Sequence, residues 1–115
     1  MIFDKPKQVV KIGDEEVELY YINALASALG RTSQTIRKWE IAGIIPDAIF
    51  RDKNGRRLYT KEQIEIMVRI AEECKITQGK SVAGTGFTKK VYKALEEHNK
   101  KYLEYFKKKK EEGGK

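Results

Sequence analysis

Hydrophobic and polar residues alternate along the first 21 residues of the chain. Apolar side chains occur in residues 9–12 and return at alternate positions in residues 17–21, with Gly13 between the two runs. A period of two is typical of strands that bury one face. The pattern predicts a β-hairpin over residues 1–21, and its several acidic residues favour a role in covering the core or a partner protein.

From residue 22 the hydrophobic period becomes that of a helix. Apolar residues recur at spacings of three and four over residues 22–29. We expect a short helix there, with Asn23 as its N-cap and Gly30 as its stop.

A second helix is predicted over residues 33–42, with Thr32 as its N-cap and Gly43 as its end. Two helices joined by so short a glycine-containing turn cross steeply, as in a helix-turn-helix. The buried stripe expected on the second helix consists of Ile36, Trp39 and Ala42, and the opposite face carries Gln34, Thr35, Arg37 and Lys38.

The next segment contains a strong hairpin signal. Asn54-Gly55 separates two strand-like runs, and an Asn-Gly pair readily adopts the positive φ angles of a tight hairpin turn. We predict a hairpin over residues 49–59 directly after the second helix, which is the arrangement of a wing beside a helix-turn-helix. The basic side chains on this hairpin are Arg51, Lys53, Arg56 and Arg57.

A third helix is predicted to open at a capping box formed by Thr60 and Gln63 and to run to about Ile76. Apolar residues cover too much of the circumference of this helix to be buried by a single neighbouring element. We therefore expect Ile66 and Ile70 to cover a second surface, either the final helix or a partner chain.

The final helix, predicted from Thr88 to about Lys110, carries a heptad-like seam. Roughly three turns of seam are marginal as an isolated coiled coil, so we expect it to pack on the third helix as well, within a dimer. His98 and Asn99 lie in mid-seam, where they either fix the register or face water. The residues expected at the dimer or oligomer contact are Val91, Leu95, His98, Tyr102 and Phe106, followed by a frayed basic tail from residue 107.

The net charge of +7 is concentrated in two blocks. Residues 30–60 have a net charge of +4 and residues 87–115 of +5, whereas residues 1–29 are acidic, at −2. A basic helix and hairpin suit a phosphate-binding face, because neutralising phosphates releases counterions. The C-terminal lysines fit either such a face or a solvated surface.

Several classes of protein are excluded by the composition. No apolar run approaches the roughly 18 residues of a membrane span, and no signal peptide is recognisable. One cysteine, Cys74, and one histidine, His98, leave little for disulfide, zinc or acid-base chemistry, and Cys74 is interpreted as a small buried hydrophobe. The Gly-Lys-Ser at residues 79–81 lacks the glycine five positions earlier that a phosphate loop needs. We expect no enzymatic activity, no metal, no cofactor and no small-molecule effector.

Residues from Tyr21 to about Ile70 resemble the DNA-binding domain of the MerR family of winged helix-turn-helix regulators. The family's recognition helix, Thr-Ile-Arg-Tyr-Tyr-Glu, appears at residues 35–40 as TIRKWE. Its Gly-Leu-Leu-Pro exit appears at residues 43–46 as GIIP, and its wing, Gly-Tyr-Arg-Leu-Tyr-Ser, at residues 55–60 as GRRLYT.

This resemblance implies a set of DNA contacts. Gln34, Thr35 and Arg37 would read bases, while Lys38, Arg56 and Arg57 would contact the backbone. Lys38 and Arg56 replace family tyrosines, so their contacts would be ionic. The full candidate set is Thr32, Gln34, Thr35, Arg37, Lys38, Arg51, Lys53, Arg56, Arg57 and Tyr59.

The predicted fold is therefore α+β, a MerR-like winged helix-turn-helix with an N-terminal β-hairpin and a C-terminal dimerisation helix. The expected segments are the hairpin at 1–21, the DNA-binding domain at 22–77, a Gly-rich connector at 78–87, and an amphipathic helix with a basic tail at 88–115. This compact form, without an effector domain, is similar to MerR-like proteins of bacteriophages and mobile elements.

The expected function is sequence-specific binding of double-stranded, palindromic DNA by a homodimeric transcriptional regulator. The helix at 33–42 would enter the major groove, with the wing at 49–59 on the backbone. An excisionase-type architectural protein and a small terminase-like packaging subunit are the alternatives. We expect a cytoplasmic, nucleoid-associated protein of a bacterial or phage-infected cell.

Overall fold

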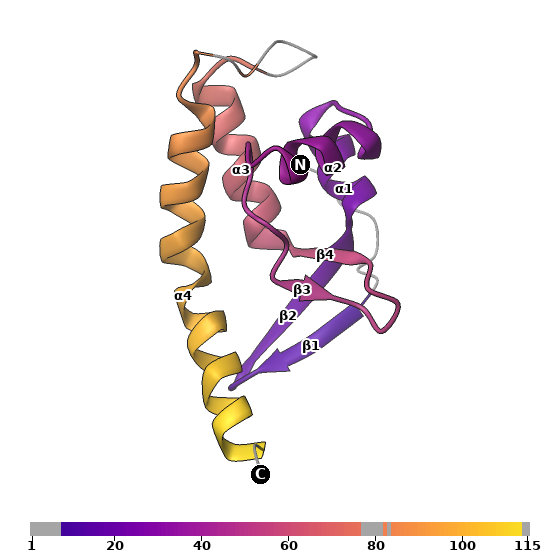
Figure 1. Ribbon diagram of the computed structural model, residues 1–115, viewed down its shortest axis with the longest axis vertical. Coiled ribbons are helices and arrows are strands. Elements are labelled where there is room, and N and C mark those ends of the chain that lie inside the picture. The colour runs from indigo at the N-terminus through magenta and orange to yellow at the C-terminus, as the bar shows by residue number, and fades with distance from the viewer. Residues whose placement is uncertain (1–7, 77–81, 83, 114–115) are drawn as a thin grey trace.

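The computed structural model describes residues 8–76, 82 and 84–113 of the 115-residue chain. Figure 1 shows a small sheet beside three short helices, with one long helix along the side of the molecule. This combination confirms the predicted α+β fold. In chain order the elements are β1 (Gln8–Ile12), β2 (Glu15–Tyr21), α1 (Ile22–Leu29), α2 (Ser33–Ile41), β3 (Phe50–Arg51), β4 (Arg57–Thr60), α3 (Lys61–Glu73) and α4 (Phe87–Gly113).

The sheet joins the N-terminal hairpin to the wing. Its strand order is β1-β2-β4-β3, and all neighbouring strands are antiparallel. In the register of β2 and β4, Leu19 lies opposite Thr60 and Tyr21 opposite Leu58. Alternation along β2 buries Val17 and Leu19 in the core. The predicted hairpin is confirmed over residues 8–21, while residues 1–7 of the predicted segment lie outside the described residues. Its pairing with β4 makes it part of the same sheet as the wing.

The start of α1 differs from the prediction. Strand β2 continues to Tyr21, so the helix begins at Ile22 and Tyr21 occupies the N-cap position without a capping side-chain hydrogen bond. Asn23 therefore lies inside the first turn, and the prediction that it caps the helix is wrong. The predicted stop is confirmed: Gly30 has a φ of 69°, and its N–H donates to the carbonyl of Ser27 at 3.1 Å.

The boundaries of α2 follow the prediction closely. The Oγ1 of Thr32 accepts a hydrogen bond from the N–H of Thr35 at 3.2 Å, which confirms the predicted cap. Ile36 is buried, as expected. Ala42 was expected in the same stripe but is exposed. It is the C-cap residue, one position beyond the end of the helix at Ile41, where the chain turns away from the core.

The capping box at the start of α3 is confirmed. Thr60 Oγ1 accepts from the N–H of Gln63 at 3.0 Å, and Gln63 Oε1 accepts from the N–H of Thr60 at 2.8 Å. The helix ends before the predicted Ile76, because Lys75 adopts a φ of 58° that a right-handed helix does not allow. Ile70 is buried in the same core as α4, in agreement with the expectation that α3 covers the final helix.

Helix α4 runs along α3 and continues past the sheet (Figure 1). Its seam is filled by the same chain, because Val91, Leu95 and Tyr102 are buried in the core. Asn99 lies there too, and its Oδ1 accepts from Nε2 of Gln63 at 2.8 Å. Packing on α3 is confirmed. That these seam residues form a dimer contact stays a prediction; Val91, Leu95 and Tyr102 are buried against their own domain and offer little surface to a second chain.

The C-terminal half of α4 covers the sheet side of the core. Tyr102 and Phe106 both pack edge-on against Phe50, with ring centroids 5.4 and 5.3 Å away. His98 is half-buried, 5.5 Å from the Tyr102 ring, and burial lowers the pKa of its imidazole. His98 and Phe106 thus also contact the chain's own core. Residues 107–110, predicted to belong to a frayed tail, are part of α4.

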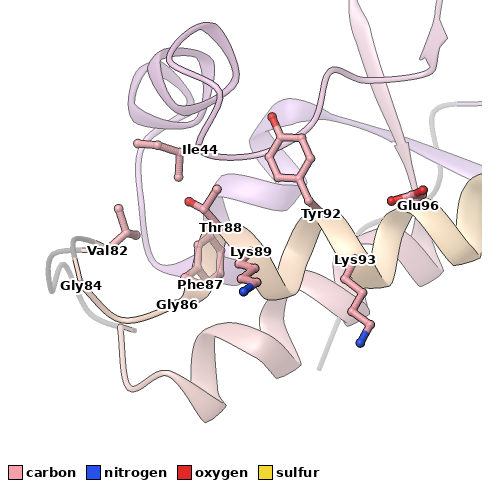
Figure 2. A pocket seen from close by; sticks show the side chains of 10 residues that line it. All are labelled: Ile44, Val82, Gly84, Gly86, Phe87, Thr88, Lys89, Tyr92, Lys93 and Glu96. Carbon is pink, nitrogen blue, oxygen red and sulfur yellow. The ribbon is translucent and has the colours of Figure 1, made fainter.

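The N-terminal half of α4 packs beside the exit of α2. Trp39 of α2 meets Phe87 edge-on at 5.7 Å, and the Tyr92 hydroxyl donates to the carbonyl of Ile45 at 3.4 Å. Figure 2 shows the cavity of about 740 Å³ that remains between these elements. Half of the predicted connector at 78–87, residues 78–81 and 83, lies outside the described residues. Helix α4 therefore contacts the helix-turn-helix at one end and the sheet at the other.

Candidate nucleic-acid interface

Helix α2 presents a polar and basic face to solvent. Ile36 and Trp39 are buried on its inner face, so residues on the far side of the helical turn point outward. This orientation follows from the 3.6-residue period and the position of the two large apolar side chains. The exposed polar residues of the outer face are Gln34, Arg37 and Lys38.

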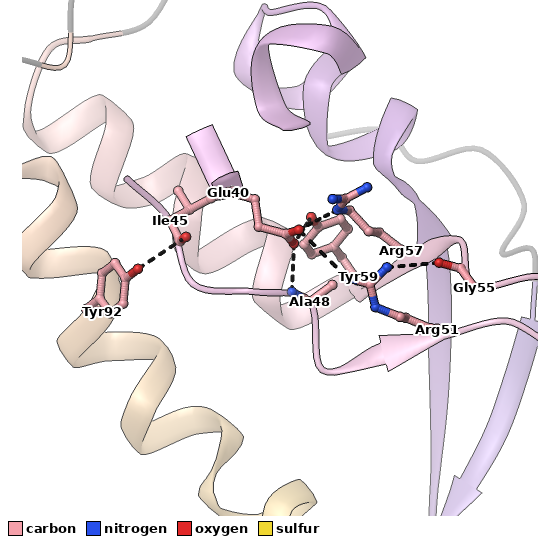
Figure 3. A network of polar contacts seen from close by, with 8 residues as sticks. All are labelled: Glu40, Ile45, Ala48, Arg51, Gly55, Arg57, Tyr59 and Tyr92. Atoms are coloured by element: carbon pink, nitrogen blue, oxygen red, sulfur yellow. Dashed lines mark hydrogen bonds and ion pairs between the residues drawn. The ribbon is translucent and has the colours of Figure 1, made fainter. Parts of the chain in front are cut away.

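Glu40, near the end of α2, links this helix to the wing (Figure 3). Its side chain is only 3 % exposed. Its Oε2 accepts from the N–H of Ala48 at 2.8 Å and from the Tyr59 hydroxyl at 3.3 Å. Its Oε1 accepts from Nε of Arg57 and lies 3.9 Å from Nη2 of Arg51. One buried carboxylate thus joins α2, the segment after it and both wing strands.

The groups around Glu40 are shifted towards their protonated forms. Hydrogen bonding to Glu40 raises the pKa of Arg57, and burial, reinforced by the charge of Glu40, raises the pKa of Tyr59. Both donors therefore keep their protons at neutral pH. A buried carboxylate is costly unless its oxygens accept hydrogen bonds, and here donors reach both oxygens.

The turn of the wing is built on Asp52. Its Oδ1 accepts from the backbone N–H groups of Asn54 and Arg56, both at 2.9 Å, and its Oδ2 accepts from the Tyr21 hydroxyl at 2.8 Å. The hydrogen bond from the Arg56 backbone is the main cause that holds the pKa of Asp52 below its usual value. Gly55 has a φ of 81°, which confirms the predicted Asn-Gly turn. The wing tip is therefore tied to β2.

Three arginines converge on an open cavity between the start of α1, α2 and the wing. Arg37 comes from α2, and Arg56 and Arg57 come from the wing; the cavity measures about 310 Å³. The guanidinium of Arg56 lies 5.9 Å from the centre of the Tyr21 ring. The first two residues of α1 also line the cavity. Because a helix N-terminus and guanidinium groups both favour anions, this cavity is suited to a phosphate group.

Three residues predicted to contact DNA have other roles in the fold. Tyr59 is 3 % exposed and donates its hydroxyl to Glu40, so it presents little surface to DNA, and its contact with DNA stays a prediction. The Thr32 hydroxyl oxygen caps α2. Arg57 shares its guanidinium with Glu40, and its side chain is 23 % exposed. Thr32 is exposed and Arg57 half-buried, and the remaining predicted residues near the α2 face and wing are likewise exposed or half-buried: Gln34, Thr35, Arg37, Lys38, Arg51, Lys53 and Arg56.

Glu40 is the functional residue that sequence reasoning missed. The sequence does contain an indication that Glu40 is buried. It stands four positions after Ile36 and one after Trp39, and this spacing puts it on the core-facing side of α2. A carboxylate at a buried position requires a partner. The partner could not be identified from the sequence, since Arg57 is 17 residues away along the chain.

Neither a metal site nor a membrane-spanning helix is found among residues 8–76, 82 and 84–113. No group of three or more His, Cys, Asp or Glu side chains there is placed to hold a metal ion. Within the same residues no helix is long and apolar enough to cross a membrane. Cys74, expected to be buried, is half-buried and forms no disulfide.

Comparison with known proteins identifies the domain to which this surface belongs. The family model described as the MerR HTH family regulatory protein matches residues 20–78, just over half of the chain. No curated protein matches the chain, and no solved structure does. The matched residues include α1, α2, the wing and α3. The chain belongs to the MerR family of helix-turn-helix regulatory proteins, which are DNA-binding transcriptional regulators and not enzymes.

Proposed function

We propose that this protein is a sequence-specific regulator that places α2 in the major groove of double-stranded DNA and the wing at 49–59 on the adjacent backbone. The observation that carries the proposal is that Arg37 of α2 and Arg56 and Arg57 of the wing line one cavity. Glu40 joins the two elements from beneath. A helix and a hairpin linked in this way can approach a duplex as one body.

The contacts divide into two kinds. Gln34 and Arg37 carry the amide and guanidinium groups that recognise base edges in the major groove. Lys38, Lys53 and Arg56 are exposed cations suited to phosphates, which give affinity without sequence information. In this arrangement the arginine cavity at the start of α1 receives one backbone phosphate.

We predict that Arg56→Ala and Gln34→Ala weaken DNA binding in different ways. Removing Arg56 lowers affinity alike for all sequences and reduces the salt slope by about one. Removing Gln34 changes which sequences are preferred. The measurement is binding of a duplex selected from a random pool, compared with random duplex at several salt concentrations.

A matched control for this experiment is Arg69→Ala. Arg69 is on α3, its side chain is 66 % exposed, and it forms only a 3.9 Å pair with Glu73. We expect its removal to leave affinity and salt slope unchanged. A wild-type protein that binds selected and random duplexes equally at every salt concentration would exclude sequence-specific binding. Equal losses on all sequences for both test variants would show that the two roles are wrongly assigned.

We propose further that the active form is a homodimer and that it binds a palindromic site, with half-sites about one helical turn apart. Because the inner seam of α4 is buried, the contact must use the outer face of the helix. This face has a groove that includes Leu103, which is 50 % exposed. Charged residues of both signs flank this side chain; the lining residues are Lys93, Glu96, Glu97, Lys100, Leu103, Glu104 and Lys107.

The dimer is tested by measuring mass in solution with sedimentation. We expect wild-type protein to associate as two copies at micromolar concentration, and Leu103→Glu to shift it towards the monomer. Val9→Glu is the matched control, because Val9 is 51 % exposed but lies on β1. Wild-type protein that stays monomeric with and without DNA would contradict the dimer.

An excisionase-type architectural role is the second candidate. It is supported by the burial of the α4 seam within one chain, since a helix already docked on its own domain needs no second copy to be stable. A monomeric protein that bends DNA would favour this role. A ring of many copies would instead favour the small terminase-like alternative.

A further inference from the structure

Ile41 is the last residue of α2 and is unusually exposed. Its exposed fraction is 79 %, the largest among the exposed large hydrophobic side chains of the described residues. The β-branched side chain is slightly less favourable in a helix than Leu or Ala, and its exposure means that it adds little to the core. Single exposed hydrophobic residues are common on protein surfaces, so the neighbours of Ile41 decide whether its position is informative.

Those neighbours are the residues proposed to contact DNA. Positions 34, 37, 38 and 41 follow the spacing of one helical face. Gln34, Arg37 and Lys38 are exposed on this face, and Ile41 continues it at the C-terminal end. An apolar side chain thus extends a polar, basic face that is directed away from the core.

Contact with a phosphate would not be favourable for the isoleucine side chain. Isoleucine has no donor for an oxygen, and placing it against charged groups loses hydration without replacing it. The major groove offers one apolar feature, the C5-methyl group of thymine, and apolar side chains recognise it. The same methyl group occurs in 5-methylcytosine. The basic residues beside Ile41 favour a nucleic acid over a protein surface as its partner.

We propose that Ile41 contacts the C5-methyl group of a pyrimidine, thymine in unmodified DNA, and so determines the sequence preference at one base pair. The inference rests on the proposed function, because it requires α2 in the major groove. Seven residues of helix advance about 10 Å, and base pairs are stacked at about 3.4 Å. Because a helix in the major groove is inclined to the DNA axis, the pyrimidine should lie within about three base pairs of the one read by Gln34.

The test is a thymine-to-deoxyuridine scan of the selected duplex. Deoxyuridine keeps every hydrogen-bonding group of thymine and lacks only the methyl group. For the wild type, replacing the contacted thymine in one half-site should lower affinity about fourfold, the value expected for one buried methyl-sized group. For Ile41→Ala the same replacement should have no effect, while the effects of replacements elsewhere should be unchanged.

Two further measurements test whether the effect is due to the methyl group and to Ile41. Cytosine at the sensitive position should weaken wild-type binding, and 5-methylcytosine there should recover the contribution of the methyl group. Val9→Ala, which truncates an exposed apolar side chain on β1, should give the wild-type pattern at every position. Circular dichroism of Ile41→Ala should match the wild type, because the residue is exposed and alanine favours the helix.

The inference is overturned if wild type and Ile41→Ala show the same deoxyuridine pattern, or if the selected site has no sensitive thymine near the predicted spacing. If Ile41→Ala instead changes the mass in solution and not the deoxyuridine pattern, Ile41 contacts protein and the inference is equally overturned. In all these cases a selected duplex is still preferred over random DNA. Failure of the proposed function itself is different, because then no duplex is preferred.

Discussion

Replacing Glu40 with alanine should destabilise the protein by about 3 kcal/mol, as expected when one partner of a buried ion pair is removed. The substitution leaves Arg57 without its carboxylate and the N–H of Ala48 and the hydroxyl of Tyr59 without an acceptor. Unpaired polar groups in buried positions cost more than the lost hydrogen bonds contribute. The measurement is urea unfolding at neutral pH.

The matched control is Glu73→Ala, because Glu73 is an exposed glutamate in a 3.9 Å pair with Arg69. Exposed pairs of this kind contribute at most about 0.5 kcal/mol, so this variant should unfold almost like the wild type. Glu40→Gln should fall between the two, since an amide oxygen still accepts a hydrogen bond while the charge is lost. Equal stabilities of Glu40→Ala and Glu73→Ala would show that the network contributes nothing.

Loss of Glu40 should also weaken DNA binding more than the loss of stability explains. The carboxylate sets the position of the wing relative to α2, and both elements must reach the duplex together. We expect a reduced affinity for Glu40→Gln under conditions where it is fully folded. Unchanged affinity and salt slope would mean that the wing finds its position on DNA without this link.

The second large effect is expected at Tyr102, where substitution by alanine should cost about 4 kcal/mol. The side chain is fully buried between α4 and the sheet and packs edge-on against Phe50. Removing a buried aromatic ring loses its transfer free energy and leaves a cavity. Hydrogen exchange should show that the C-terminal half of α4 loses protection before α3 does.

Tyr102→Phe separates the ring from the hydroxyl. Within the described residues the Tyr102 oxygen is buried with no hydrogen-bond partner. Its removal should therefore leave the free energy of unfolding unchanged or raise it slightly. A typical hydrogen bond contributes about 1 kcal/mol to stability. A larger decrease in the free energy of unfolding would therefore show that the Tyr102 hydroxyl has a hydrogen-bond partner.

Local signals in the sequence predicted the helix-turn-helix and the wing well. The capping threonines at 32 and 60 and the glycines at 30 and 55 act through hydrogen bonds and φ angles within a few residues, so their effects do not depend on the rest of the fold. The prediction that Asn23 caps α1 was wrong because a non-local interaction decided where the helix begins. The pairing of β2 with β4 extends the strand to Tyr21. The local sequence around Asn23 does not indicate this pairing, because β4 is distant along the chain.

Sites formed by distant residues were not predictable in the same way. The link between Glu40 and Arg57 joins positions 17 residues apart, and it also explains why Tyr59 is buried rather than available to DNA. Only the relative position of α2 and the wing brings these groups together. The sequence spacing puts Glu40 on the same side of the helix as Ile36, but it does not indicate which side chains Glu40 would meet there.

The sequence by itself determined the local elements: the hairpin, the capped helices, the Asn-Gly turn and the basic outer face of α2. It also determined that α4 has an apolar seam. Only the tertiary structure decided that α3 and the sheet, not a second chain, fill that seam. The physical reason is that hydrophobic burial is non-directional, so an apolar stripe specifies that it will be covered and not by which surface.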